Sequence, residues 1–285
     1  MNSLCLDADD VFADGTFKCC PTYFQQLYTI HGFKNGHYIP LVFCLLPYKS
    51  GDCYRKMFSL LKECCAKCNV IMNFTTIHVD FEETMHTVVK EVFPGVIIKG
   101  CRFHLGQAWW RKIQNLGLAK EYKKRGSEVS KWLHHFFGLA FLEPDEVADC
   151  FAENLIQDMP SDMKVEAFAD YVLSTYVDDN ALFPTSVWTE TPSNVRRTNN
   201  GPGAFHRHYN EQLYASHPFM FVFLYQIVKI QATTYIKIRS TNSAAVRSRH
   251  NSEKESVAIE KFQKNARGEI RGSHEHRGSM LIYVC

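Results

Sequence analysis

The chain has 285 residues and a net charge of +2, and 46% of its residues are hydrophobic. This size and composition suit a globular protein with one large domain or two small ones. No apolar run reaches the roughly 18 residues that a membrane helix needs, and the N-terminus lacks the basic and apolar regions of a signal peptide. Residues 229–285 hold 11 Lys and Arg against 5 Asp and Glu, which favours either a polyanionic partner or a solvated basic tail.

The first elements of the chain are predicted to be three strands with short links. Residues 10–21, 24–33 and 38–47 are rich in β-branched, aromatic and leucine side chains. Gly36 supplies a turn between the second and third of these segments, and Pro40 suits a strand start. Three successive strands joined in this way predict an antiparallel meander.

Helices and strands then alternate. Residues 51–69 carry apolar side chains at helical spacing, and a second helix is predicted over residues 82–94. A fourth strand is predicted over residues 69–80, a fifth over 95–104, and a third helix over 105–118. This order of elements is that of the ribonuclease H-like fold, so we predict an α/β protein whose mixed five-stranded sheet has helices on both faces.

From about residue 118 the pattern becomes helical, which predicts an all-α insertion. A turn-rich connector follows, then one or two helices, and the chain after Ser240 is polar and expected to be partly disordered. We therefore divide the chain into a first part of the core over residues 1–117, a helical insertion with its connector over 118–195, a completion of the core over 196–239, and a basic tail over 240–285.

Two aspartates follow predicted strands at places where one metal site could form. Asp14 ends the first strand and Asp80 ends the fourth, and these strands are neighbours in this sheet order. Two carboxylates suit a pair of Mg²⁺ ions about 4 Å apart that clamp the attacking and leaving oxygens of a phosphodiester. For each aspartate taken alone, a turn or helix-cap role is the alternative.

Three separated segments carry a resemblance to a known family. They read DGTFKCCPTYFQQLYTIHG, VDFEETMHTVVKEVFPGVIIKGCRFHLGQAWWRKIQNLGL and RRTNNGPGAFHRHYN. In this order and spacing they resemble the transposase domain of Mutator-like elements (MULE) over roughly residues 10–238. The resemblance implies a ribonuclease H-like core with a catalytic Asp, Asp and Glu, in which Asp14 matches the first acid and Asp80 the second. It also implies Mg²⁺ or Mn²⁺ as the cofactor, cleavage and transfer of DNA strands, a nuclear location, and a homo-oligomer acting on paired transposon ends.

The third acid is where this chain departs from the family pattern, which is close to Thr-Asn-Asn-x-x-Glu-x-x-His. After the Thr-Asn-Asn run at residues 198–200, Gly203 stands where the glutamate is expected. Glycine has no side-chain oxygen, so one metal ligand is lost, and we expect activity to be lost or strongly reduced. Asn210 and Glu190 are the alternatives that could supply an oxygen instead.

The eleven cysteines indicate an intracellular, reduced protein, because their number is odd and most lie in apolar segments. The family carries a Cys-x-x-His signature, matched here by Cys101 and His104, which would make half a zinc site. Cys65 and Cys68 form a second candidate pair on a predicted amphipathic helix. Structural packing is the alternative for both pairs, and each needs further ligands to bind zinc.

Basic residues near the predicted site are the candidate DNA contacts, because phosphate is bound through positive charge and without regard to base sequence. They are Arg102, Arg111, Lys112, Arg196, Arg197 and Arg207. Residues 123–125 are a candidate nuclear-import signal, for which a solvated helix face is the alternative. Trp109 and Trp110 are predicted to pack in the core against the sheet, and stacking on bases is the alternative.

Two interpretations stand beside an impaired transposase. One is a non-catalytic DNA- or protein-binding module domesticated from a transposon, which Gly203 favours and the retained Asp14 and Asp80 oppose. The other is a decayed element copy, against which the open reading frame argues. In the family a DNA-reading module, often a zinc finger, precedes the first acid. No finger-type spacing of Cys and His precedes Asp14, so recognition of element ends is expected to be incomplete.

Overall fold

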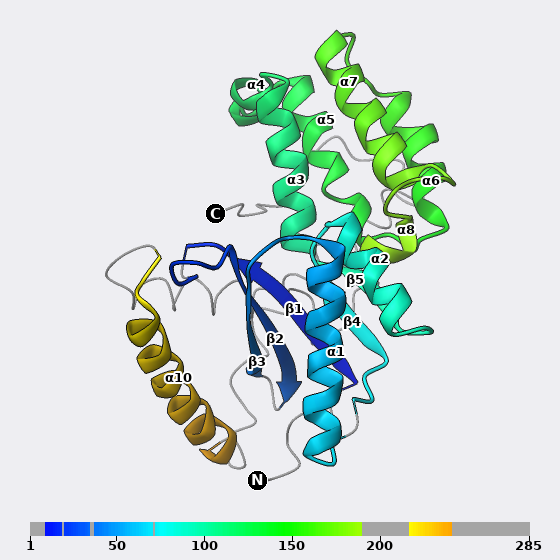
Figure 1. Cartoon of the computed structure of the whole chain (residues 1–285). Coiled ribbons are helices and arrows are strands. Elements are labelled where there is room, and N and C mark those ends of the chain that lie inside the picture. Colours follow the sequence, from blue (N-terminus) through cyan, green and yellow to red (C-terminus); the bar gives the residue numbers. More distant parts are fainter. Residues whose placement is uncertain (1–8, 19, 35–36, 71, 190–216, 241–285) are drawn as a thin grey trace. The chain divides into compact units, whose positions relative to one another are not determined.

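The computed structural model describes residues 9–18, 20–34, 37–70, 72–189 and 217–240 (Figure 1). The described residues divide into two compact units. The sheet unit holds those between 9 and 101 and between 217 and 240, and the helical unit holds residues 102–189.

The sheet unit is built on a mixed five-stranded sheet with the strand order β3-β2-β1-β4-β5. Its strands are β1 (Asp10–Thr16), β2 (Gln26–Lys34), β3 (His37–Leu46), β4 (Thr76–Val79) and β5 (Ile97–Gly100). The first three form an antiparallel meander, and β4 pairs parallel to both β1 and β5. This confirms the predicted ribonuclease H-like order. The carboxyl ends of β1, β3, β4 and β5 therefore lie at one edge, called here the carboxyl edge.

One face of the sheet is covered by α1 (Gly51–Lys67) and α2 (Glu83–Val92). Ser50 caps α1 by accepting a hydrogen bond from the backbone N–H of Cys53 (3.4 Å). The buried residues of these helices fall at the spacing of one helix face. They are Tyr54, Met57 and Phe58 in α1 and Met85, Val88 and Val89 in α2, and they pack on alternate residues of the central strands such as Val11, Ala13, Ile77 and Val79.

The opposite face carries α10 (Met220–Ser240), which packs over the meander. Phe223 of this helix is buried in a cluster with Leu27 and Cys20. Leu27 alternates along β2 with residues that face α1, so α10 and α1 lie on opposite sides of the sheet (Figure 1). The prediction of helices on both faces is thereby confirmed.

The helical unit contains only helices and connecting loops in its described residues. They are α3 (Arg102–Asn115), α4 (Ala119–Lys123), α5 (Glu128–Phe136), α6 (Glu146–Cys150), α7 (Met163–Val172) and α8 (Thr185–Trp188), with a 3₁₀ turn at Leu139–Phe141 and π-helical turns at Phe151–Ile156 and Leu173–Val177. Trp109 is buried here against the rings of Phe137, Tyr176 and Trp188, at centroid distances of 5.6–5.8 Å. The predicted burial of Trp109 is confirmed, but its ring contacts are with helical aromatics and not with strands. Trp110 is only half-buried, against the ring of Tyr122.

Two strand boundaries differ from the sequence prediction. The fourth strand covers only Thr76–Val79 rather than 69–80, and the fifth covers Ile97–Gly100 rather than 95–104. Helix α3 begins at Arg102, because the apolar spacing that follows Gly100 is helical and places Leu105, Trp109 and Ile113 on its buried face. Within the described ranges, no helix has the length and apolar character to cross a membrane.

Candidate functional site

Strand register places the two predicted aspartates together. Phe12 of β1 pairs with His78 of β4 in parallel register, and their rings stack with centroids 4.2 Å apart. Two residues further along each strand lie Asp14 and Asp80. Because side chains alternate between faces, both aspartates fall on the same face as Phe12 and His78, at the carboxyl edge.

Asp14 is held in a nearly buried position, with 9% of its surface exposed. Its Oδ1 accepts a hydrogen bond from the backbone N–H of Gly15 (2.8 Å), and Thr29 of β2 donates its hydroxyl to the Asp14 carbonyl (3.3 Å). A Cβ on Gly15 would collide with the side-chain amide of Gln26. The glycine after the aspartate therefore lets Gln26 lie across the end of β1.

The loop that carries Asp80 is held at each of its three residues. His86 of α2 donates its Nε2–H to the carbonyl of Asp80 (2.8 Å); a carbonyl only accepts, so this nitrogen carries the proton. Burial lowers the pKa of His86, which favours the neutral ring. The ring of Phe81 lies over Gly100 of β5 so closely that a Cβ there would overlap it. Glu82 is held by side chains from two other elements.

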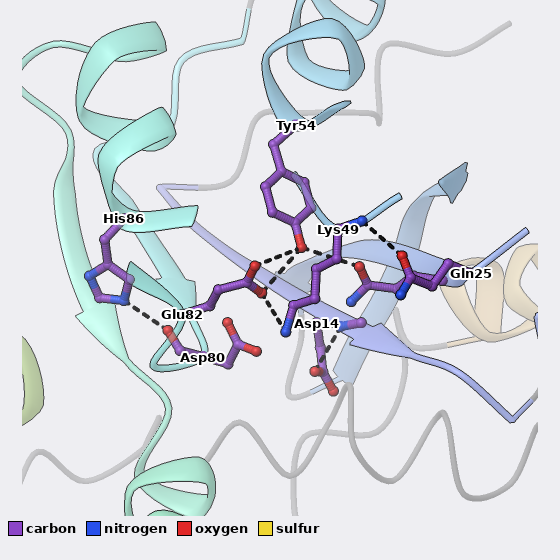
Figure 2. Close-up of polar contacts among 9 residues, drawn as sticks. Asp14, Gln25, Lys49, Tyr54, Asp80, Glu82 and His86 are labelled. Atoms are coloured by element: carbon purple, nitrogen blue, oxygen red, sulfur yellow. Dashed lines mark hydrogen bonds and ion pairs between the residues drawn. The ribbon is translucent and has the colours of Figure 1, made fainter. Parts of the chain in front are cut away.

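Glu82 sits in a polar network two residues after Asp80. Lys49 Nζ lies 2.8 Å from Glu82 Oε2, and the Tyr54 hydroxyl lies 3.1 Å from both Glu82 oxygens and 3.2 Å from Gln26 Oε1. The Tyr54 hydroxyl has one hydrogen, and Glu82 is the charged acceptor, so the hydroxyl donates to Glu82. The Tyr54 oxygen then accepts from the side-chain N–H of Gln26, whose amide oxygen and nitrogen are interchangeable in position. Figure 2 shows Asp80 and Glu82 extending from the β4–α2 loop toward Lys49 and Asp14.

Electrostatics give a second sign that these carboxylates converge. Tyr28 is buried, and its hydroxyl has no hydrogen-bond partner among the described residues. Its pKa is raised well above the usual value, first by burial and then by the negative charge of Asp80, with smaller contributions from Tyr54, Asp14 and Glu82. The carboxylates of Asp14, Asp80 and Glu82 therefore all lie close enough to the Tyr28 hydroxyl to raise its pKa.

Asp14 and Asp80 have the chemistry of ligands for a hard cation such as Mg²⁺. In the described part of the chain, no three His, Cys, Asp or Glu side chains gather closely enough to hold a metal ion. Mg²⁺ is commonly bound through one or two carboxylates, with waters and substrate phosphates filling its other positions. Asp14 and Asp80 are two such carboxylates at one edge of the sheet, and their oxygens are of the hard type that Mg²⁺ prefers.

The predicted zinc pairs show no third ligand among the residues that the structure describes. Cys101 is buried in the sheet unit, and its backbone N–H donates to the Val79 carbonyl (2.7 Å). His104 is half-buried on α3 of the helical unit. Cys65 is half-buried and Cys68 is exposed at the end of α1. Zinc binding at either pair therefore stays a prediction.

The predicted DNA contacts fall partly inside the described residues. Arg102 lies over the ring of Phe141 and Lys112 over the ring of Tyr171, each 4.8 Å from the centroid, while Arg111 is exposed; all three are on α3. The remaining predicted positions, Arg196, Arg197, Arg207, Gly203, Glu190 and Asn210, lie outside the described residues.

Sequence reasoning missed Glu82, Lys49, Tyr54 and Gln26. No spacing pattern marks Glu82, because the chain bends at Phe81 and strand alternation does not carry over from Asp80. No signal marks Tyr54 either, which by its spacing is an ordinary buried position on α1.

The sheet order and the helices on both faces define a ribonuclease H-like α/β core, with Asp14 and Asp80 at its carboxyl edge. Residues 11–108, roughly a third of the chain, match the family model of the MULE transposase domain, so this segment is a MULE transposase domain. The match includes both aspartates and ends within α3. No curated protein matches the chain.

Proposed function

We propose that the protein acts on DNA phosphodiesters by strand cleavage and transfer, with Asp14 and Asp80 as ligands of Mg²⁺ or Mn²⁺. The register that pairs Phe12 with His78, and so brings both aspartates to one face and one edge, carries the proposal. Bound metal ions would polarise the phosphoryl group and activate water or a 3′-hydroxyl for attack. The Gly15 N–H orients one oxygen of Asp14, and His86 fixes the backbone of Asp80, so neither acid has to be ordered when substrate binds.

We further propose that catalysis is impaired, because Gly203 occupies the position of the third acid in the family pattern. Two carboxylates can recruit a metal ion, but a third oxygen ligand is needed to fix the second ion of a two-metal site. The expected result is weak or absent strand transfer beside retained DNA binding, and a nuclear protein whose action depends on DNA contact.

Nicking of supercoiled plasmid in Mn²⁺ tests both parts. The native chain is compared with Gly203→Glu and Asp14→Asn. Nicking by Gly203→Glu alone supports the site and the impairment together. Nicking by the native chain that Asp14→Asn abolishes supports the site and contradicts the impairment. If Gly203→Glu does not nick although it binds duplex DNA, the proposed catalytic site is wrong.

A non-catalytic DNA-binding module is the second candidate, and Gly203 is the observation that favours it. On this alternative, Asp14→Asn leaves duplex affinity unchanged, and the affinity falls steeply with salt because released counterions drive the binding. Elemental analysis of the same preparation tests the zinc pairs Cys101 with His104 and Cys65 with Cys68. Zinc below one equivalent removes both pairs as metal sites.

A further inference from the structure

Exposed aromatic side chains are confined to one region of the described chain. Those with the largest exposed fractions are Phe17, Tyr23, Tyr48, Phe219, Phe221 and Tyr225. The first three lie on the β1–β2 and β3–α1 loops at the carboxyl edge, and the others lie on α10 or immediately before it. In the helical unit, the described aromatic side chains are buried or half-buried. Clustering of large exposed rings is a sign of a binding surface, whereas scattered ones are ordinary.

The two aromatic loops are tied to each other and to the aspartate pair. The backbone N–H of Gln25 donates to the Leu46 carbonyl (2.9 Å), and the Gln25 side-chain oxygen accepts from the backbone N–H of Lys49 (3.0 Å). Lys49 Nζ then lies 5.9 Å from the centroid of the Phe17 ring and also binds Glu82, two residues from Asp80. Aromatic rings and acids therefore share one continuous edge.

Tyr23 is strained as well as exposed. Its φ is 81°, in the left-handed region that costs a bulky residue about 1–2 kcal/mol, and its side chain is 95% exposed. The turn is held by the Phe24 N–H, which donates to the Pro21 carbonyl (3.1 Å), and by Thr22, whose N–H donates to the Pro218 carbonyl (3.3 Å). Because the ring is exposed, its packing does not offset this cost, and strained turns of this kind are often found at binding sites.

We propose that Phe17, Tyr23 and Tyr48, together with Lys49, form a stacking surface for unpaired nucleotides beside the Asp14–Asp80 pair. The bases of a single strand offer free π faces to such rings, whereas those of a duplex are already stacked on one another. An ammonium group has three N–H donors, of which Glu82 takes one, so Lys49 can also bind a phosphate of the same strand. The ligand is a short unpaired DNA segment next to the scissile phosphate, an inference that rests on the proposed function.

Fluorescence anisotropy with a labelled single strand and with the matching duplex tests this surface in the full chain. Phe17→Ala, Tyr23→Ala and Tyr48→Ala are each expected to weaken single-strand binding about tenfold, since a stacked base contributes about 1–3 kcal/mol, and to leave duplex binding unchanged. Leu60→Ala and Met163→Ala, which remove exposed apolar side chains elsewhere, are the controls and are expected to change neither affinity. Thermal melting of each variant checks that the fold is kept.

The outcomes separate this surface from the proposed function. Single-strand binding that survives the three substitutions, beside intact duplex binding, overturns the stacking surface alone. An equal loss for single strand and duplex also overturns stacking, because it shows a contact common to both phosphate backbones. A native chain that binds neither form overturns the surface and the DNA-directed function together.

Discussion

At the scale of single residues, Tyr54 connects the core of the sheet unit to the acids at its edge. Its side chain is buried, and burial is the main reason why its pKa is raised. The negative charge of Glu82 and the hydrogen bond to Glu82 raise the pKa further. Tyr54→Phe keeps the ring and removes the hydroxyl, leaving Gln26 and Glu82 without that partner. We expect the free energy of unfolding to fall by about 1–3 kcal/mol, measured by urea denaturation. Tyr48→Phe, whose hydroxyl is exposed, is the matched control and should change stability little. Equal values for the two variants would contradict the network.

The close approach of Phe81 to Gly100 predicts a residue-scale effect on the loop that holds Asp80. A methyl group on Gly100 overlaps the Phe81 ring, so Gly100→Ala must push the ring and its loop outward. We expect a loss of about 1–3 kcal/mol of stability, as for other overpacked sites. Replacing Phe81 by Leu in the same chain should recover part of that loss, and Gly106→Ala, whose Cβ meets only an ordinary contact at 3.8 Å, should not destabilise. An additive double variant would show that the two residues do not touch.

Two half-buried thiols, Cys44 and Cys150, predict how stability changes in alkali. Burial, with smaller contributions from Cys53 and Cys64, raises the pKa of Cys44 to about 11, and burial also raises that of Cys150 to about 11. Between about pH 9 and pH 11 the unfolded chain loses these protons while the folded chain keeps them. The free energy of unfolding should therefore fall as pH rises through that window, by up to about 1.4 kcal/mol per pH unit for each thiol. Urea titrations at several pH values measure the slope, which Cys44→Ala should reduce and Cys68→Ala, at an exposed position, should not.

The residues of the site show what sequence could and could not predict. Asp14 and Asp80 were predictable because the succession of strands and helices along the chain indicates the sheet order, and side-chain alternation then puts both residues at one edge. Glu82, Lys49 and Gln26 were not, since their contacts join β2, the β3–α1 loop and the β4–α2 loop, and no pattern in the chain sets those distances. The ends of the fourth and fifth strands were misplaced because an apolar run continues into a loop or a helix without changing composition.

At the scale of elements, α10 predicts a sharp difference between two neighbouring phenylalanines. Phe223 is 3% exposed and packs with Leu27, while Phe221 is 87% exposed. Phe223→Ala removes a buried ring and should cost about 3–5 kcal/mol, whereas Phe221→Ala should cost little. Urea denaturation measures both, and hydrogen exchange shows whether α10 loosens before the sheet. Similar losses for the two variants would mean that α10 does not pack on the meander as described.

At the scale of the whole molecule, charge is divided along the helical unit. Residues 102–135 contain eight Lys and Arg against two Asp and Glu, and residues 136–189 contain one against eleven. The basic segment includes Arg111 and Lys112, which were predicted as DNA contacts, and the exposed Lys120, Lys124 and Arg125. Such a division favours phosphate binding along α3 and α4 and repels DNA from α6 and α7.

Charge reversal in each segment distinguishes two possibilities. Either DNA binds the basic segment, residues 102–135, or the affinity for DNA depends only on the net charge of the protein. Replacing Lys120, Lys124 and Arg125 by Glu should weaken duplex binding and lower the dependence of log affinity on log salt by about 0.9 for each phosphate that the variant no longer binds. A second variant carries Lys at three exposed acidic positions, Glu153, Asp158 and Asp170. It raises the net charge by as much as the first variant lowers it. If α3 and α4 bind the DNA, this second variant should leave the salt dependence almost unchanged, because its new positive charges lie on a surface that DNA does not touch. A gain in affinity as large as the decrease in the first variant would show that net charge alone governs binding, and that residues 102–135 are not a DNA-binding surface.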